Sequence, residues 1–298
     1  MSSLTAALPG LGWLLDSPFM RNAFLAGTLI ALACGLVGYF LVLRAQVFTS
    51  DALSHVAFTA ALGALAFGLD PRLGLFAGTI LVALAMAALG RRASADDVVI
   101  GSTFAWVLGL GVLFLTLYTT QHSTANGVAS VNYLFGSIFG LSTTEAVSAA
   151  LVGAAICVAV LVIARPLLFA SLDEAVAAAA GVPVRLLGVV FLVLVAATTA
   201  EATQAVGALL VLGLVAAPAG AAQQLTARPY VALGLSVVFA VGAMWIGLTV
   251  AYLAPQLPPS FAIISVATAT YLAAMLWAWM RRARPAARAV GSGEAATG

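Results

Sequence analysis

The chain has 298 residues, of which 63% are hydrophobic and 7% charged, and its mean hydropathy is +1.15. This composition excludes an ordinary soluble globular protein and is typical of a chain whose solvent is lipid. The formal net charge is only +2 and the few basic residues lie between apolar runs, which excludes a nucleic-acid-binding role. We therefore expect a multi-pass protein of the cytoplasmic membrane, with one transmembrane domain over residues 1–298.

Apolar runs of about 20 residues, long enough to cross a hydrocarbon core, occur at 19–43, 50–69, 72–90, 97–118, 143–164, 186–205, 229–254 and 260–280. A shorter run, 207–225, is interrupted by three glycines and Pro218, so it either spans the membrane or forms a half-helix or re-entrant piece. Backbone polar groups must be paired in lipid, and the runs lack the alternation of a β-barrel. The sequence therefore predicts an all-α bundle of about nine membrane segments, or about eight if 207–225 does not span.

The arginines indicate the orientation of the bundle. If nine segments alternate, ten of them share one side: Arg44, Arg91, Arg92, Arg165, Arg185, Arg228, Arg281, Arg282, Arg284 and Arg288. The positive-inside rule places that side in the cytoplasm, with the tail 281–298, and leaves Arg21 and Arg72 outside. Residues 1–18 lack the basic region of a signal peptide and are expected to form an extracytoplasmic or interfacial segment.

A piece that does not belong in lipid follows the fifth run, with the sequence ASLDEAVAAAAGVPVRLLG over residues 170–188. Asp173 and Glu174 fall where an alanine-rich helix would begin, as the helix dipole prefers, and Gly181 with Pro183 marks its end. The region 171–188 therefore predicts a short amphipathic helix on the cytoplasmic face. An ordinary interhelical loop is the alternative.

The stretch SDALSHVAF places Asp51 and His55 four residues apart at the start of an apolar segment, so both project from one helical face. Ionisable residues inside a membrane segment are costly and usually belong to a pathway. A carboxylate and an imidazole are ligand types that suit zinc, manganese or iron(II). The alternative is that Asp51 caps the helix and His55 donates to a carbonyl of a neighbouring helix.

Five stretches together resemble the integral-membrane permeases of ATP-binding-cassette importers for zinc and manganese, which are distantly related to the cobalamin and siderophore permeases. They are GYFLVLRAQVFTSDALSHVAF, DDVVIGSTFAWVLGLGVLFL, NYLFGSIFGLS, LDEAVAAAAGVPV and VGALLVLGLVAAPAGAA. The DALSH and LFGSI motifs are the specific ones. The resemblance implies a permease dimer, made of two copies or of two related chains, that receives a metal ion from an extracytoplasmic binding protein.

The resemblance also implies two cytoplasmic ATPase subunits that drive the change of access. The chain contains no lysine, so it cannot carry the lysine of a nucleotide-binding P-loop, and we expect it to be a transporter subunit and not an enzyme. By similarity, the cytoplasmic helix would sit in a groove on the ATPase. Its coupling residues would be Leu172, Asp173, Glu174, Ala175 and Gly181.

Asp51 and His55 are the metal contacts that the resemblance favours, with the ion as cargo and no permanently bound cofactor. Two ligands are few for a held ion, and a second permease facing the first across a two-fold axis would double them. Glu201 is a further candidate ligand; alternatively it lies in an outer vestibule or bonds to Thr198 and Thr203. His122 reads as a solvated loop residue. Two other functions stay open: a permease for a metal chelate such as a siderophore, haem or cobalamin, and an intramembrane metallohydrolase.

Overall fold

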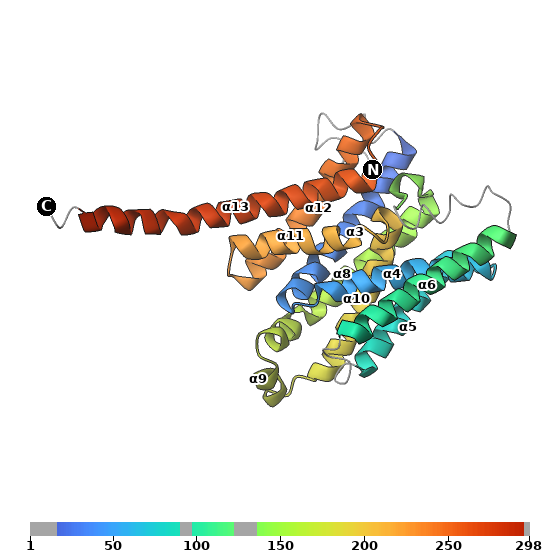
Figure 1. Cartoon of the computed structure of the whole chain (residues 1–298), viewed down its shortest axis with the longest axis horizontal. Helices are drawn as coiled ribbons and strands as arrows, with labels where there is room; N and C mark the ends of the chain where they lie inside the picture. Colours follow the sequence, from blue (N-terminus) through green and yellow to red (C-terminus); the bar gives the residue numbers. More distant parts are fainter. Residues whose placement is uncertain (1–16, 90–96, 122–135, 295–298) are drawn as a thin grey trace.

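The computed structural model describes residues 17–89, 97–121 and 136–294, and helices make up nearly all of it (Figure 1). In chain order they are α3 (Pro18–Leu43), α4 (Val47–Ala66), α5 (Pro71–Leu89), α6 (Asp97–Gln121), the 3-10 turn η2 (Ile138–Gly140), α8 (Thr143–Leu172), α9 (Glu174–Ala179), α10 (Val184–Val206), α11 (Val211–Leu225), α12 (Pro229–Leu253) and α13 (Pro259–Glu294). The predicted all-α class is confirmed. The predicted segment 1–18, apart from its last two residues, and His122 lie outside the described residues.

Six of the described helices are long and apolar enough to cross a membrane: α3, α5, α8, α10, α12 and the first part of α13. The structure forms a helix at each of the nine predicted segments, but α4, α11 and the part of α6 over 104–120 do not reach this standard. Polar residues near the start of α4, Ser50 to His55, lower its hydropathy. The 15 residues of α11 cover about 22 Å at 1.5 Å per residue, less than the roughly 30 Å of a hydrocarbon core.

Several helix ends differ from the sequence prediction. Helix α8 was expected to end at 164 but continues through Pro166 to Leu172, and α13 continues past 280 to Glu294. Helix α4 begins at Val47, three residues before the predicted start. A capping box fixes the start of α8, because the Ser142 hydroxyl accepts from the Glu145 N–H while the Glu145 carboxylate accepts from the Ser142 N–H at 2.8 Å.

The helices form two groups joined by a central one. In the first group, here called the α4–α6 group, α5 and α6 each pack on α4, while α3, α8, α11, α12 and α13 form the larger part of the bundle. Helix α10 packs against α3 and α8 on one side and against α4 and α5 on the other. Figure 1 shows the α4–α6 group lying side by side along one flank.

Small residues allow the helices to approach closely, as is common in membranes, where apolar burial alone does not drive association. Helix α3 buries a row of alanines and glycines against its neighbours. At Gly38 a Cβ atom would lie 2.1 Å from the carbonyl oxygen of Val215, so α3 and α11 touch backbone to backbone. The largest buried rings, Phe40 and Phe191, meet edge to face at 6.1 Å between α3 and α10.

Candidate functional site

Asp51 and His55 lie one turn apart on α4, and both are half-buried. Helix α4 begins at Val47 with Gln46 as its N-cap residue, so the alternative in which Asp51 caps the helix is wrong. The His55 ring meets Phe104 of α6 edge on, with 4.8 Å between ring centroids. Within the described residues, neither the Asp51 carboxylate nor the His55 imidazole has a hydrogen-bond partner.

Two serines hold this turn of α4 in place. The Ser50 hydroxyl pairs with the Thr199 hydroxyl of α10 at 3.1 Å, and the Ser54 hydroxyl donates to the Ala208 carbonyl at 2.9 Å. Ala208 lies in the break between α10 and α11, which Gly207 makes with φ +90°. The break frees a backbone carbonyl, and Ser54 satisfies it next to the candidate site.

The same contacts place the site inside the length of the bundle. At about 1.5 Å per residue, Thr199 lies about 22 Å along α10 from Val184 and about 10 Å from Val206. Ser50, and with it Asp51, sits level with Thr199 and not with the start of α10. The ionisable pair is therefore held at depth, where such residues usually serve a pathway.

One chain does not complete a metal site among its described residues. No group of three or more His, Cys, Asp or Glu side chains is gathered there. Glu201, the further candidate ligand, is 1% exposed and so does not line an open vestibule. Thr198 and Thr203 donate to backbone carbonyls of α10 and not to Glu201. The structure thus places Glu201 apart from Asp51 and His55.

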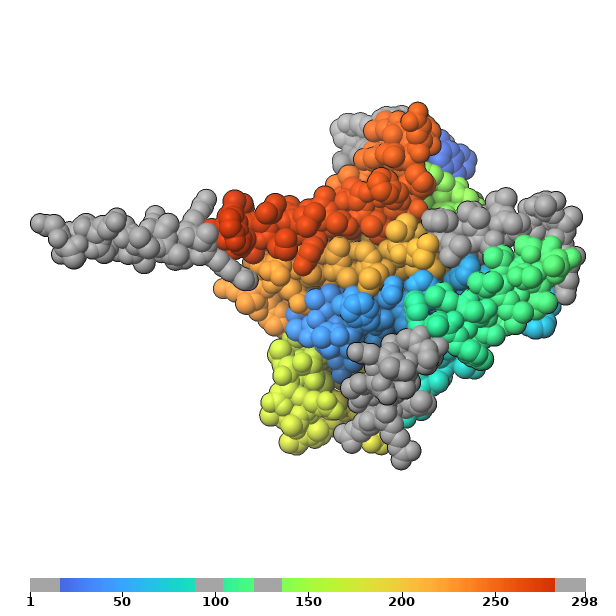
Figure 2. Space-filling view, viewed as in Figure 1, coloured from blue at the N-terminus to red at the C-terminus, as the bar shows by residue number. Residues whose placement is uncertain are grey.

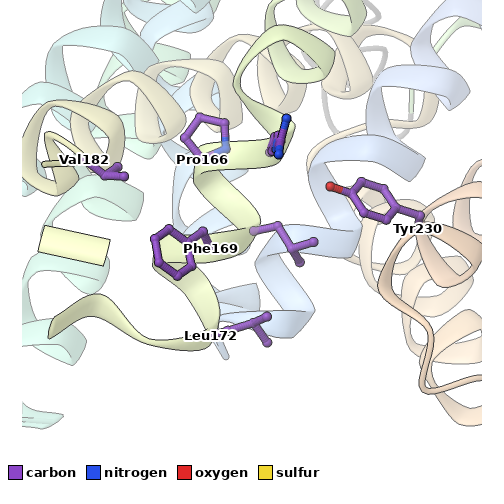
Figure 3. Close-up of a pocket in the computed structure, with 7 residues that line it drawn as sticks. Pro166, Phe169, Leu172, Val182 and Tyr230 are labelled. Carbon is purple, nitrogen blue, oxygen red and sulfur yellow. The ribbon is translucent and has the colours of Figure 1, made fainter. Parts of the chain in front are cut away.

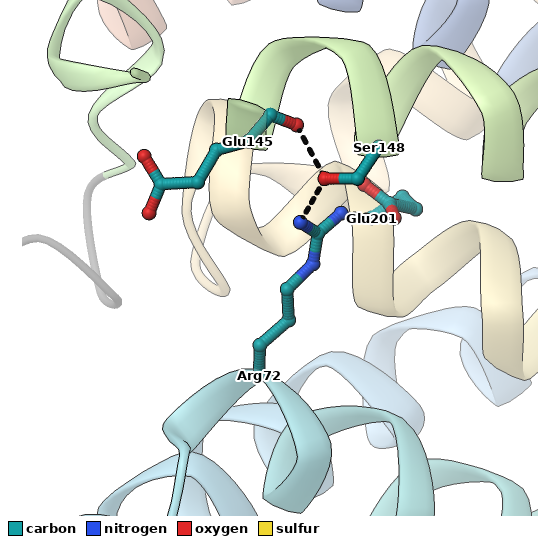
Figure 4. A network of polar contacts seen from close by, with 4 residues as sticks. All are labelled: Arg72, Glu145, Ser148 and Glu201. Carbon is teal, nitrogen blue, oxygen red and sulfur yellow. Dashed lines mark hydrogen bonds and ion pairs between the residues drawn. The ribbon is translucent and has the colours of Figure 1, made fainter. Parts of the chain in front are cut away.

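Glu201 instead pairs with Arg72 of α5, with 3.1 Å between Nη2 and Oε1 (Figure 4). The same guanidinium donates through Nη1 to the Ser148 hydroxyl of α8, and that hydroxyl donates to the Glu145 carbonyl at 2.9 Å. The Asp70 carboxylate accepts from the Arg72 N–H at 2.8 Å and so fixes the start of α5. No local pattern in the sequence connects Arg72 with Glu201; the only signal is that Arg72 stands nearly alone on its predicted side.

The described part of the LFGSI motif, Gly136 to Ile138, lies just before α8. Gly136 has φ +76°, and a Cβ atom there would lie 2.4 Å from the Ala205 carbonyl oxygen. The Ser137 N–H donates to the Gln204 carbonyl at 3.2 Å. Only glycine fits both the left-handed backbone and the close approach. The motif therefore joins the loop before α8 to the end of α10.

The predicted helix after α8 is present as α9, and it protrudes at the lower edge of the molecule (Figure 2). Asp173 is its N-cap, and the carboxylate accepts from the Val176 N–H at 3.0 Å. Gly181, with φ +84°, ends it in a Schellman motif in which the Val182 N–H donates to the Ala177 carbonyl. Leu172 at the end of α8 and Val176 of α9 are 64% and 51% exposed, so the junction of the two helices presents an apolar surface to the outside.

A hollow of about 530 Å³ adjoins α9 at the end of α8 (Figure 3). Its lining is Arg165, Pro166, Leu168, Phe169, Leu172, Val182 and Tyr230. Phe169 and Leu172 come from α8, and Tyr230 reaches toward them from α12. The lining comes from the end of α8, the segment after α9 and the start of α12. The C-terminal end of α8 and the start of α12 therefore lie at the same end of the bundle as α9.

Arg44 connects this end of the bundle with the turn before α4. Its guanidinium lies 5.6 Å from the centroid of the Phe191 ring. Burial lowers the pKa of Arg44, and the negative charge of Glu174 on α9 opposes that shift. Glu174 therefore lies within electrostatic range of the α3–α4 turn, seven residues before Asp51.

The fold and the site define a polytopic membrane protein with ionisable side chains held inside a helical bundle, which is the arrangement of a transport protein. Residues 16–278 match the ABC 3 transport family, and the chain belongs to that family. This match confirms the resemblance carried by the DALSH and LFGSI motifs.

Relatives and a solved structure agree with this assignment. A manganese transport system membrane protein, MntC of Halalkalibacterium halodurans, is 28% identical and aligns over 76% of this chain and 77% of its own. An uncharacterized membrane protein of Synechocystis is 32% identical over 87% of this chain and 90% of its own. The structure of PsaBC from Streptococcus pneumoniae in complex with Fab superposes with a TM-score of 0.77 at 25% identity, covering 92% of this chain and 95% of that one.

Proposed function

We propose that this chain is the permease subunit of an ATP-binding-cassette importer that moves a divalent metal ion into the cytoplasm. The observation that carries the proposal is the Asp51–His55 pair, which lies on one face of α4 at depth, with no hydrogen-bond partner among the described residues. Relatives named as manganese and iron transport proteins support a metal ion as cargo. Zinc, manganese and iron(II) all accept a carboxylate and an imidazole.

A second permease completes the site. Asp51 and His55 are half-buried in the single chain, and Phe48, one turn before Ala52 on the same helix, is 81% exposed. Facing copies of α4 across a two-fold axis would gather two carboxylates and two imidazoles. Four such ligands match the coordination number of zinc, while leaving a site without the thiolates of a permanent zinc cage. The second permease is either an identical or a related chain.

The ATPase docks on α9 and on the neighbouring hollow. Leu172 and Val176 supply exposed apolar contacts, while Asp173 and Glu174 supply charge at the helix start. Apolar anchors on a short helix suit a groove on a partner protein. Movement of α9 would reach the site through the electrostatic interaction of Glu174 with Arg44, in the turn that leads into α4. The change of access then follows from ATP binding and hydrolysis on the partner.

The arginines are distributed unequally between the two ends of the bundle. Three lie at the α9 end: Arg44, Arg165 and Arg228, the N-cap of α12. Arg72 lies at the start of α5, beside Ser148 and Glu201. This arrangement supports a cytoplasmic α9 end, a cytoplasmic C-terminus and an outer N-terminus. Ions would arrive from an extracytoplasmic binding protein at the opposite end. The import direction rests on this orientation.

Uptake of radiolabelled zinc and manganese tests the proposal in cells that lack their own importers and express the permease with its ATPase and binding protein. His55→Ala removes the nitrogen ligand and should abolish uptake, with the permease still present at wild-type amount and still bound to the ATPase. Arg21→Gln, an exposed change at the start of α3, is the control. Wild-type uptake by His55→Ala would contradict the proposed site.

A further inference from the structure

Besides the Ser50 and Ser54 hydrogen bonds of α4, an ion pair at the start of α5 ties the α4–α6 group to the rest of the bundle. Arg72 begins α5, and it reaches Glu201 of α10 and Ser148 of α8 (Figure 4). Helix α5 packs on α4 and α10, whereas α8 packs mainly on α3 and α10. The Arg72 side chain therefore links three helices, two of which have little other contact with each other.

Within the α4–α6 group, α4 and α5 are packed closely enough to move as a unit. A Cβ atom on Gly74 would lie 2.4 Å from the Cβ of Ala64, and one on Gly78 would lie 2.3 Å from the Cβ of Ala60. Such close packing leaves little room for sliding between α4 and α5. A displacement of α5 from α10 therefore carries α4, and with it Asp51 and His55.

The ion pair lies beside the candidate site on α10. Glu201 is two residues beyond Thr199, the partner of Ser50, which is an axial step of about 3 Å. Thr199 faces α4, and Glu201 faces α5 and α8. One short stretch of α10 thus holds the start of α4 through a hydroxyl pair and the start of α5 through a charge pair.

The connection is strong but not fully satisfied. The Glu201 side chain is 2% exposed and that of Arg72 is 24% exposed, so the carboxylate depends on the guanidinium for its charge balance, while the guanidinium can turn toward solvent. Glu201 Oε2 and Gln204 Nε2 are buried and have no hydrogen-bond partner among the described residues. Buried polar groups without a partner call for an explanation, and a second arrangement of the ion pair that satisfies them would supply one.

We propose that the Arg72–Glu201 pair, supported by Ser148, is a latch that positions the α4–α6 group against α10 and opens and closes during each transport cycle. Closed, it holds the Asp51–His55 face of α4 in register with α10. Open, it leaves the α4–α6 group held by its packing on α10 and by the Ser50–Thr199 and Ser54–Ala208 hydrogen bonds. The latch rests on the proposed transport function, because it acts on the residues that would hold the ion.

The test uses the assembled transporter and three variants, Glu201→Gln, Arg72→Gln and the double variant. Arg72→Gln alone leaves a buried unpaired carboxylate and should lower the amount of permease, so the uncharged double variant carries the test. Loss of the latch should reduce maximal uptake about tenfold per permease in all three, a size typical of coupling between separate elements. ATP hydrolysis by the complex should persist, so uptake per ATP falls. The losses should not add, because each variant removes the same latch.

Arg21→Gln is the matched control, an exposed arginine near the start of α3 with no ion pair among the described residues, and should transport normally. Wild-type uptake per ATP in Glu201→Gln and in the double variant would overturn the latch. So would a large loss in Glu201→Gln alone with normal uptake in Arg72→Gln, since that pattern assigns Glu201 to the ion and not to Arg72. Asp51→Asn, measured beside these variants, separates the two proposals. If Asp51→Asn and the latch variants all transport normally, the proposed function fails. If Asp51→Asn is inactive and the latch variants transport normally, only the latch fails.

Discussion

The Ser54 hydroxyl donates to the Ala208 carbonyl at 2.9 Å, and this bond joins the turn of α4 that carries His55 to the break between α10 and α11. The same hydroxyl lies 2.7 Å from the Asp51 carbonyl. A single small side chain thus connects the candidate ligands with the one place where the α10–α11 backbone leaves helical geometry. Rearrangement at the break would be felt directly at the ligands.

Ser54→Ala tests this connection. The change leaves a buried carbonyl without its donor, which costs about 1–3 kcal/mol, and it frees the start of α4 from the break. We expect weaker metal binding, seen as a higher KM for uptake, with the permease still in the membrane. Ser171→Ala is the control, because the Ser171 hydroxyl bonds only to the Leu167 carbonyl within α8. Equal KM values for wild type and Ser54→Ala would show that the break does not position the site.

Gly136→Ala tests the role of the LFGSI glycine. An alanine there has to adopt φ +76° and place its Cβ against the Ala205 carbonyl, and the left-handed backbone alone costs about 1–2 kcal/mol. We expect a lower melting temperature of the purified complex and less permease in the membrane. At Gly140 a new Cβ would meet only the Ser137 side chain, at 3.5 Å, so Gly140→Ala should be nearly neutral. Equal melting temperatures for the two variants would show that the close approach at Gly136 does not affect the stability of the complex.

Asp173→Ala tests α9 as the coupling element. Removal of the N-cap costs a helix about 1 kcal/mol, and α9 has only six residues with which to absorb the loss. We expect uptake per ATP to fall while the permease remains in the membrane. Asp173→Ser keeps a capping oxygen and should retain coupling, so it separates the cap from the charge. A fully coupled Asp173→Ala transporter would remove α9 from the proposed mechanism.

Much of the fold follows from the sequence, because lipid forces apolar runs of this length into helices. The predicted run 229–254 matches α12 within one residue, and Asp173 and Gly181 bound α9 as their capping chemistry indicates. The end of α8 was misplaced by eight residues, since Arg165 and Pro166 look like a terminus in sequence. In the structure α8 continues through Pro166 to Leu172. Proline is tolerated inside a membrane helix when neighbouring helices or local adjustments satisfy the freed backbone groups.

The site was predictable only in part. Asp51 and His55 share a helical face at a spacing of four, which the sequence shows directly. The contacts that hold this turn of α4 do not follow from local pattern: Thr199 and Ala208 are brought to Ser50 and Ser54 by packing between helices far apart in the chain. The Arg72–Glu201 pair spans 129 positions, and no periodicity links its members. For the same reason the ligands that we propose a second permease to contribute follow neither from the sequence nor from one chain.

The measurement that tests the central claim most directly is the metal content of the purified permease dimer, for wild type, Asp51→Asn and Asp51→Glu. The amide keeps the shape of the aspartate but lacks the charge that holds a divalent cation, whereas the longer carboxylate can still reach it. We predict zinc or manganese bound to the wild type at about one ion per dimer, as expected for a four-ligand site on the two-fold axis. Asp51→Glu should retain part of this binding and Asp51→Asn almost none, with equal amounts of protein. Equal metal binding by wild type and Asp51→Asn would contradict the assignment of Asp51 and His55 as the ion's ligands.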